Sequence, residues 1–199
     1  MNLNQDSPHS FQPAQPKVPE HLAAGGYASA MITSHTREEF VLDFIAGFIQ
    51  PSRVVARVIL NPAHVKRLAA AIRSNLEMYE RNVGALPESP KPPAEPLRSA
   101  PAQDFYSQLT VPDQVLMGCY ANSVVINHTR EEFILNFIAS FPPTPVLAAR
   151  VLVSPAHMRR IVRVLEARLR MYENAFGALP GPSASPEPPP ESGSRFSLS

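Results

Sequence analysis

A polar pentapeptide, His-Thr-Arg-Glu-Glu, carries the side chains of this chain that are best suited to chemistry, and it occurs twice. The first copy is His35, Thr36, Arg37, Glu38 and Glu39, and the second is His128, Thr129, Arg130, Glu131 and Glu132. An imidazole beside two carboxylates can transfer protons, but no nucleophile lies near either copy in the sequence. Both copies are therefore candidate recognition turns. The alternative is that Thr and Glu only complete the hydrogen bonds of a turn while His packs at its edge.

A basic stripe on the last predicted helix is the second candidate. Its members are Arg159, Arg160, Arg163 and Arg170, and Glu166 partly offsets their charge. Clustered arginines bind nucleic acid by releasing counterions from its phosphates. No aromatic platform or known nucleic-acid motif accompanies the stripe, so a solvated helix face remains the alternative.

Other catalytic and metal-binding patterns are absent from the sequence. It contains no glycine-rich phosphate loop, serine-nucleophile elbow or pair of catalytic carboxylates. The lone cysteine, Cys119, excludes an internal disulfide and a cysteine-cluster metal site. His64 and His157, taken with the two turn histidines, do not show a metal-ligand spacing. We expect no catalytic residues, no metal, no cofactor and no identifiable small-molecule ligand, and hence a protein that is not an enzyme.

The repeated pentapeptide belongs to a much longer internal repeat. His35 and His128 are 93 residues apart, and the same offset aligns residues 18–87 with residues 111–180 without a gap. About 31 of these roughly 70 aligned positions are identical. The chain is therefore a tandem duplication of a small domain or half-domain.

The hydrophobic periodicity predicts three strands and one helix in each repeat. The predicted strands are residues 27–34, 40–44 and 54–60, with equivalents at 120–127, 133–137 and 147–153, and the pentapeptide connects the first two. A helix follows, with Asn61 or Ser154 as N-cap and proline at its first position. Gly84 and Gly177 are placed to end these helices. Each unit is thus predicted to be β-β-β-α.

The predicted fold class is α+β, with two such units packed as a pseudo-two-fold intramolecular pair. One unit alone is too small to bury a good core, and the second faces of its strands are partly apolar. The alternative is two beads that each pair with another chain. Arg57 is expected to pair across strands with Asp43, whereas its equivalent Arg150 would meet the uncharged Asn136.

The segments outside the repeats are rich in proline and polar residues. We predict a disordered N-terminal segment (1–17), a proline-rich linker (88–110) and a disordered tail (181–199). We interpret the proline-rich stretches as spacers, with ligands for proline-recognition modules as the alternative. The formal net charge of +1 provides no strong field toward nucleic acid or membrane. Without an apolar signal or membrane segment, the protein is expected to be soluble and cytoplasmic.

A set of short motifs resembles an uncharacterised bacterial family, the domain-of-unknown-function family numbered 3467. The motifs are Tyr120-Ala121-Asn122, His35 to Phe44, Ala-Arg-Val, Pro-Ala-His, Tyr-Glu and Phe-Gly, and together they span both repeats. The resemblance implies a fused pair of a domain that usually occurs once, and it implies no established activity or ligand. The first copy departs from the family pattern at Ser29, and the second departs at Asn136.

The fused repeat and the missing catalytic set favour one function class. We expect a non-enzymatic protein-interaction or assembly module with a protein partner or self-association. The alternative is a nucleic-acid-binding or regulatory protein that uses the basic stripe.

Overall fold

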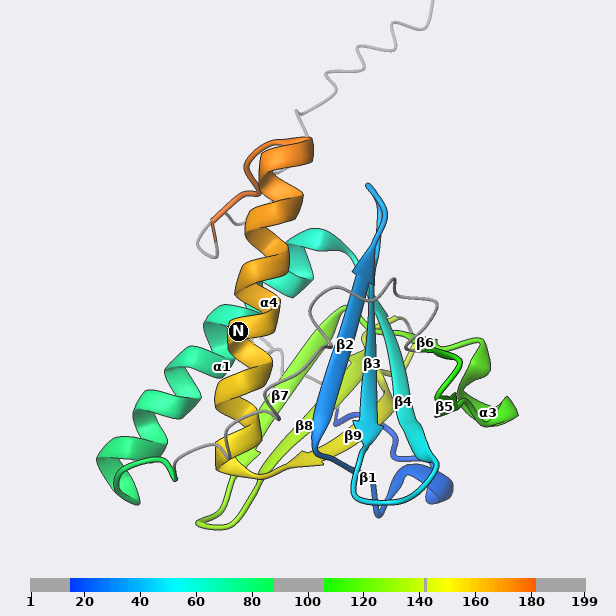
Figure 1. Cartoon of the computed structure of the whole chain (residues 1–199), viewed down its shortest axis with the longest axis vertical. Coiled ribbons are helices and arrows are strands. Elements are labelled where there is room, and N and C mark those ends of the chain that lie inside the picture. The colour runs from blue at the N-terminus through cyan, green and yellow to red at the C-terminus, as the bar shows by residue number, and fades with distance from the viewer. Residues whose placement is uncertain (1–14, 88–105, 142, 182–199) are drawn as a thin grey trace, which may run out of the picture.

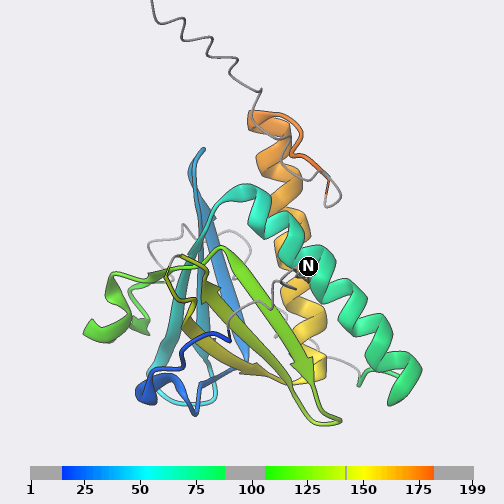
Figure 2. The same ribbon diagram turned by 180° about the vertical axis from the view of Figure 1, so that it is seen from behind.

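Two twisted β-sheets and two long helices build the protein. The computed structural model describes residues 15–87, 106–141 and 143–181. Figure 1 shows one sheet in front of the other with both helices along one flank, and Figure 2 shows the same arrangement from behind. The elements of the first repeat are η1 (Glu20–Leu22), β1 (Gly26–Ala28), β2 (Ala30–His35), β3 (Phe40–Ala46), β4 (Ser52–Leu60) and α1 (Pro62–Asn82). Those that follow are β5 (Leu109–Thr110), α3 (Asp113–Leu116), β6 (Cys119–Tyr120), β7 (Ser123–His128), β8 (Phe133–Ala139), β9 (Val146–Val153) and α4 (Pro155–Phe176).

The predicted α+β class and the repeated β-β-β-α arrangement are confirmed. In each repeat an antiparallel three-stranded meander, β2-β3-β4 or β7-β8-β9, precedes the long helix. Alternate residues of β3 point to the core, and Phe40, Leu42 and Phe44 are fully buried. Both meanders have a register shift at the same place, after Phe44 and after Phe137.

The prediction of one continuous first strand in each repeat is wrong. The stretch 27–34 is divided at Ser29, so that β1 joins the other repeat's sheet while β2 stays in its own. β1 pairs in parallel with β9, and β6 of the second repeat pairs in parallel with β4 in the same way. Periodicity could not show this division, because β1 and β2 have the same extended backbone and differ only in their neighbours.

The helices confirm the predicted caps. Asn61 Oδ1 accepts a hydrogen bond from the His64 N–H at 3.0 Å, and Ser154 Oγ accepts one from the His157 N–H. Beyond the helix ends, Gly84 and Gly177 have positive φ angles of 124° and 98°. The apolar stripe of α1 is buried at Val65, Leu68, Ile72, Leu76 and Tyr79, and the equivalent α4 residues are buried from Met158 to Tyr172.

The two repeats share one core around a pseudo-two-fold axis, as expected for the internal pair. The helices run antiparallel against each other, and each also packs on the first meander strand of the other repeat, α4 on β2 and α1 on β7. Phe44 and its equivalent Phe137 contact each other, with ring centroids 5.6 Å apart. Contacts therefore recur in equivalent pairs, and one hydrophobic cluster includes side chains of both repeats.

The predicted boundary segments lie at the edges of what the structure describes. Residues 1–14, most of the predicted linker and the tail after residue 181 lie outside the described residues. The end of the predicted linker forms β5, which pairs with β4, and Lys17 forms the equivalent bridge to Val146. Within the described ranges, no helix is long and apolar enough to cross a membrane.

Candidate functional site

Each His-Thr-Arg-Glu-Glu segment forms a tight hairpin turn. Thr36 Oγ1 accepts hydrogen bonds from the N–H groups of Glu38 and Glu39, both at 3.2 Å. The Thr36 N–H also donates to the Glu39 carbonyl oxygen at 2.9 Å. Thr129 makes the same three contacts in the second turn. The threonines therefore hold the turns by a local side-chain mechanism.

Each turn is also a docking point for the helix of the other repeat. The Tyr172 hydroxyl donates to the Arg37 carbonyl oxygen at 2.7 Å, and Tyr79 donates to the Arg130 carbonyl oxygen at the same distance. The His35 ring packs against Tyr172, with centroids 5.6 Å apart, and also against Phe40. These contacts give the turns a structural role, and their role in recognition stays a prediction.

The two turns do not form a composite site. Along the antiparallel helices, the ion pair Lys66–Glu173 lies near the first turn and the pair Glu80–Arg159 near the second. The pairs are separated by fourteen residues of α1, which is about 21 Å at 1.5 Å per residue. The hairpin tips accordingly point to opposite ends of the molecule (Figure 1).

The four arginines of the basic stripe have different surroundings. Arg159 lies 3.5 Å from Glu80 and donates to the Leu86 carbonyl oxygen, so it joins α4 to α1. Arg160 has a buried Nη2 with no hydrogen-bond partner among the described residues. Arg163 and Arg170 are exposed. The stripe is therefore partly used in the interface between the repeats.

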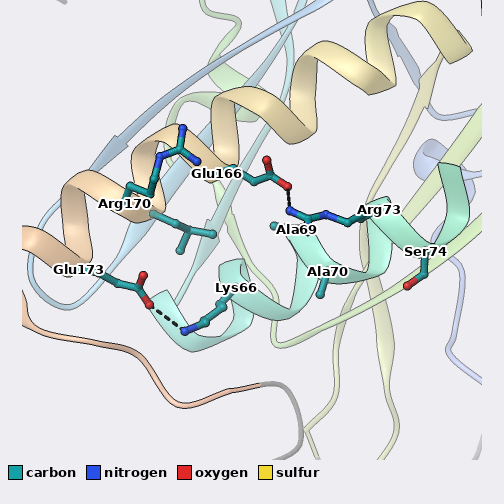
Figure 3. A pocket seen from close by; sticks show the side chains of 9 residues that line it. Lys66, Ala69, Ala70, Arg73, Ser74, Glu166, Arg170 and Glu173 are labelled. Atoms are coloured by element: carbon teal, nitrogen blue, oxygen red, sulfur yellow. Dashed lines mark hydrogen bonds and ion pairs between the residues drawn. The ribbon is translucent and has the colours of Figure 1, made fainter. Parts of the chain in front are cut away.

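A charged groove of about 410 Å³ lies between the two helices. Lys66 Nζ donates to Glu173 Oε1 at 2.8 Å and to the Leu179 carbonyl oxygen at 2.7 Å, and Arg73 pairs with Glu166. The hydrogen bond from Lys66 lowers the pKa of Glu173. Figure 3 shows these pairs reaching from one helix to the other across the groove, with Arg170 beside them. Ion pairs thus bridge the groove and join the two helices.

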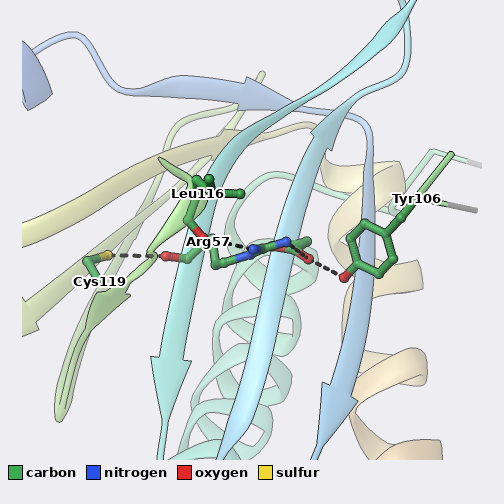
Figure 4. A network of polar contacts seen from close by, with 5 residues as sticks. Arg57, Tyr106, Leu116 and Cys119 are labelled. Carbon is green, nitrogen blue, oxygen red and sulfur yellow. Dashed lines mark hydrogen bonds and ion pairs between the residues drawn. The ribbon is translucent and has the colours of Figure 1, made fainter. Parts of the chain in front are cut away.

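The Arg57–Asp43 pair is present as predicted, in a larger network (Figure 4). Arg57 Nε donates to Asp43 Oδ1 at 2.7 Å, its Nη2 donates to Oδ2 at 3.0 Å, and its Nη1 donates to the Leu116 carbonyl oxygen. The hydroxyl of Tyr106 donates to Asp43 Oδ2, and the ring centroid of Tyr106 lies 5.8 Å from Arg57 Cζ. The hydrogen bonds to Asp43 raise the pKa of Arg57. Burial raises the pKa of Tyr106 to about 12, together with the hydrogen bond between its hydroxyl and Asp43. The charges of Arg57 and Asp43 cancel, and both carboxylate oxygens of Asp43 accept hydrogen bonds.

A cavity of about 650 Å³ lies on the pseudo-two-fold axis, next to the segments that cross between repeats. Equivalent pairs line it, among them Leu22 with Val115 and Ala56 with Ala149. Cys119 also lines it; its Sγ lies 3.4 Å from the Arg57 carbonyl oxygen, and burial raises the pKa of the thiol to about 11. Such a thiol is not reactive at neutral pH. The cavity is suited to an apolar group.

The terminal strands of the two sheets differ in how deeply their side chains are buried. β2 and β7 are the terminal strands of their sheets and pair on one side only among the described strands. Met31 and Thr33 of β2 are buried, whereas β7 has no buried residue and Val125 is 46% exposed. β7 contains no proline or charged residue, apart from the histidine at its end. Its sequence therefore lacks the proline and charged side chains that often protect a terminal strand, although α1 packs against β7.

A second cavity, of about 200 Å³, opens beside the start of β7. Its apolar lining comes from Leu60, Leu68, Ala71, Val124 and Phe137, and His64, Arg67, Asn122 and Ser123 complete it. At the equivalent place beside β2, Met31 of the first repeat stands at the position of Val124, and Val164 of the second repeat stands at the position of Ala71. Val124 and Ala71 in the cavity lining are thus smaller than the side chains at the equivalent positions.

The sequence did not point to two of these features. Tyr106 lies in the predicted linker, and its counterpart in the repeat alignment is Pro13, so no repeated pattern marks it. The cavity beside β7 contains residues from both repeats, and no local pattern reports their contact. The sequence did carry one signal for this cavity. At two pairs of equivalent positions, Met31 with Val124 and Val164 with Ala71, the side chain in the cavity lining is the smaller one.

Comparison with known proteins identifies one family. The model of the family described as "Protein of unknown function (DUF3467)" matches residues 1–88 and, separately, residues 90–180. The two adjacent matches agree with the tandem repeat. No curated protein and no solved structure matches the chain.

Proposed function

Since this chain belongs to the DUF3467 family and carries two copies of its domain, we propose that it is a non-enzymatic protein-interaction module that binds an extended peptide segment along β7. The observation that carries the proposal is that β7 pairs on one side only among the described strands and lies next to a largely apolar cavity. In strand addition, main-chain hydrogen bonds supply affinity, and pockets for alternate side chains supply specificity.

The fold already uses this kind of pairing to hold its own halves together. β1 adds to the edge of β9 and β6 adds to the edge of β4, both as short parallel strands. Sheets of this fold therefore accept added strands at one edge, and β7 offers an opposite edge with the same backbone groups.

The chemistry of the cavity indicates the kind of peptide that fits. Leu68, Val124 and Phe137 would surround an apolar side chain, whereas His64 and the exposed Arg67 lie at the same opening. A peptide with one bulky apolar residue and a nearby acidic residue is complementary to this lining.

Peptide selection against the whole chain tests the proposal. Displayed random peptides are selected on the wild-type protein and then measured on the variant Ala71→Val with Val124→Met, which carries the side chains found at the equivalent positions. We expect apolar, acidic peptides whose amide-shift changes map to β7 and whose affinity falls at least about tenfold in the variant, since a filled pocket excludes the anchor. Ile32→Val, on the other edge strand, is the control and should leave the affinity unchanged.

Two results would contradict the proposal. The first is a selection that enriches no peptide, and the second is a set of peptides that bind the filled variant as well as the wild type.

Nucleic-acid binding by the basic stripe is tested separately by a gel-shift series across salt concentrations with Arg163→Ala plus Arg170→Ala. Because Arg159 already pairs with Glu80, we favour the protein partner over nucleic acid.

A further inference from the structure

The second repeat contains an open version of the site that Tyr106 closes in the first repeat. A cavity of about 300 Å³ is lined by Asn136 and Arg150 with Ala23, Ala24, Asn127, Ile134 and Leu152. Its Asn136 and Arg150 are the equivalents of Asp43 and Arg57. We propose that this cavity is a binding site for a small aromatic carboxylate.

The argument begins with the charge of Arg150. In the first repeat Asp43 neutralises the guanidinium of Arg57, but in the second repeat the partner is the uncharged amide of Asn136. No acidic residue lines the cavity. Arg150 therefore keeps an uncompensated positive charge at a partly buried position, which favours an anion there.

The hydrogen-bond pattern defines where that anion sits. Arg150 Nε donates to Asn136 Oδ1 at 2.7 Å, and Nη1 donates to the Ala23 carbonyl oxygen at 2.6 Å. With Oδ1 used in this way, Asn136 Nδ2 takes the place at which Asp43 Oδ2 accepts from Arg57 in the first repeat. Arg150 Nη2 and Asn136 Nδ2 thus form a pair of donors, and no described residue accepts a hydrogen bond from either. A carboxylate oxygen can accept from both.

The preference for an aromatic ring comes from the occupant of the first site. Tyr106 places its ring 5.8 Å from Arg57 Cζ and its hydroxyl on the carboxylate of Asp43. The cavity beside Arg150 in the second repeat is bounded in part by the apolar Ile134 and Leu152. A benzoate-like ring would lie against these side chains and over the guanidinium, with its carboxylate toward the two donors.

The guanidinium of Arg150 is preorganised for such a ligand. Gly25 has a φ of 72°, and a Cβ at this position would lie 2.7 Å from Arg150 Cγ. Only glycine allows the crossing segment to lie this close, and that segment supplies the Ala23 carbonyl that orients Arg150. The site lies between the two repeats, since the first repeat contributes the carbonyl oxygen of Ala23 and the second contributes the donors.

Titration of the whole chain with sodium benzoate, followed by the Asn136 side-chain amide and Arg150 Hε resonances, tests the inference. We expect saturable shifts at these two groups and at least about tenfold weaker binding of the uncharged isostere benzamide, because the charge is lost. N-Acetylglutamate amide, which represents a carboxylate on a peptide, should bind more weakly than benzoate because it lacks the ring. Tighter binding of the glutamate compound would overturn the aromatic assignment.

The internal repeat provides the decisive variant. Asn136→Asp recreates the carboxylate of the first repeat, so it should fold and pair with Arg150 while weakening benzoate binding at least about tenfold. Asp43→Asn, the reverse change in the other repeat, is the matched control and should leave the benzoate shifts at Asn136 in place. The inference fails if benzoate gives no saturable shift, if benzamide binds equally well, or if Asn136→Asp binds benzoate like the wild type. These results do not depend on peptide binding at β7.

Discussion

Arg73 and Glu166 occupy the same position of the two repeats, and they pair with each other across the pseudo-two-fold axis. A residue on such an axis meets its own equivalent, so two identical repeats would place two like charges there. The flanking pairs, Lys66–Glu173 and Arg159–Glu80, are equivalent to each other and keep the same sign in both repeats. The axial position is therefore where the duplicated sequences have become complementary.

Charge reversal at this position should weaken the pairing of the repeats. Glu166→Arg places two arginines opposite each other, and Arg73→Glu places two glutamates there. Each single variant is expected to melt at a lower temperature than the wild type, and the double variant, which exchanges the two charges, should recover most of the loss. Differential scanning fluorimetry at low and high salt measures this, and the effects should shrink at high salt.

The exposed Arg81 on the same helix provides the control for these variants. Arg81→Glu should have little effect on the melting temperature, because no described acidic residue pairs with Arg81. If the double variant lowered the melting temperature as much as the two single variants do, the result would contradict the pairing of Arg73 with Glu166 across the axis.

Removal of the hydroxyl of Tyr79 or Tyr172 should loosen one turn at a time. Tyr172→Phe deletes the bond to the Arg37 carbonyl oxygen, and Tyr79→Phe deletes the bond to the Arg130 carbonyl oxygen. Each change should lower the free energy of unfolding by about 1 kcal/mol, measured by urea denaturation. The two losses should add, because the turns are far apart. Tyr27→Phe, at an exposed tyrosine, is the control.

Separated repeats should not fold as independent units. Division of the chain near Ala100 removes β1 from β9, β6 from β4 and each long helix from the other repeat's strand. Each fragment alone should lack a cooperative melting transition, and the mixed fragments should regain one as a one-to-one complex. Sedimentation equilibrium and calorimetry measure both outcomes, and an isolated fragment that melts cooperatively as a monomer would contradict the shared core.

Stability should fall in weak acid because of two partly buried histidines. Burial lowers the pKa of His64 and of His157 below the ordinary value of 6.5, with smaller contributions from Arg67 and Arg160. As the pH falls through 6.5, the unfolded chain takes up protons before the folded chain does, so the free energy of unfolding decreases. Urea denaturation at pH 7.5 and 5.5 should show this decrease, and His64→Gln should reduce it. A pH dependence that is unchanged in His64→Gln would exclude the contribution of His64.

Much of the local structure could be predicted because short-range patterns carry it. The Asn61 and Ser154 caps, the prolines that follow them and the alternation Phe40-Leu42-Phe44 depend on neighbours within a few residues. The cross-strand partner of Arg57 also followed from the strand register. Tyr106 could not be found in this way, because its contact with Asp43 joins residues that are far apart in sequence and has no repeated counterpart.

The sequence by itself determined that this protein is a duplicated β-β-β-α unit and that each unit needs a partner surface. Both facts follow from periodicity and from the amount of apolar side chain in each repeat. Only the tertiary structure decided that the halves exchange β1 and β6, that Arg73 faces Glu166, and that the site at Arg150 is open while the site at Arg57 is closed. These features depend on contacts between distant segments, and hydrophobic periodicity reports which face of an element is buried, but not which element buries it.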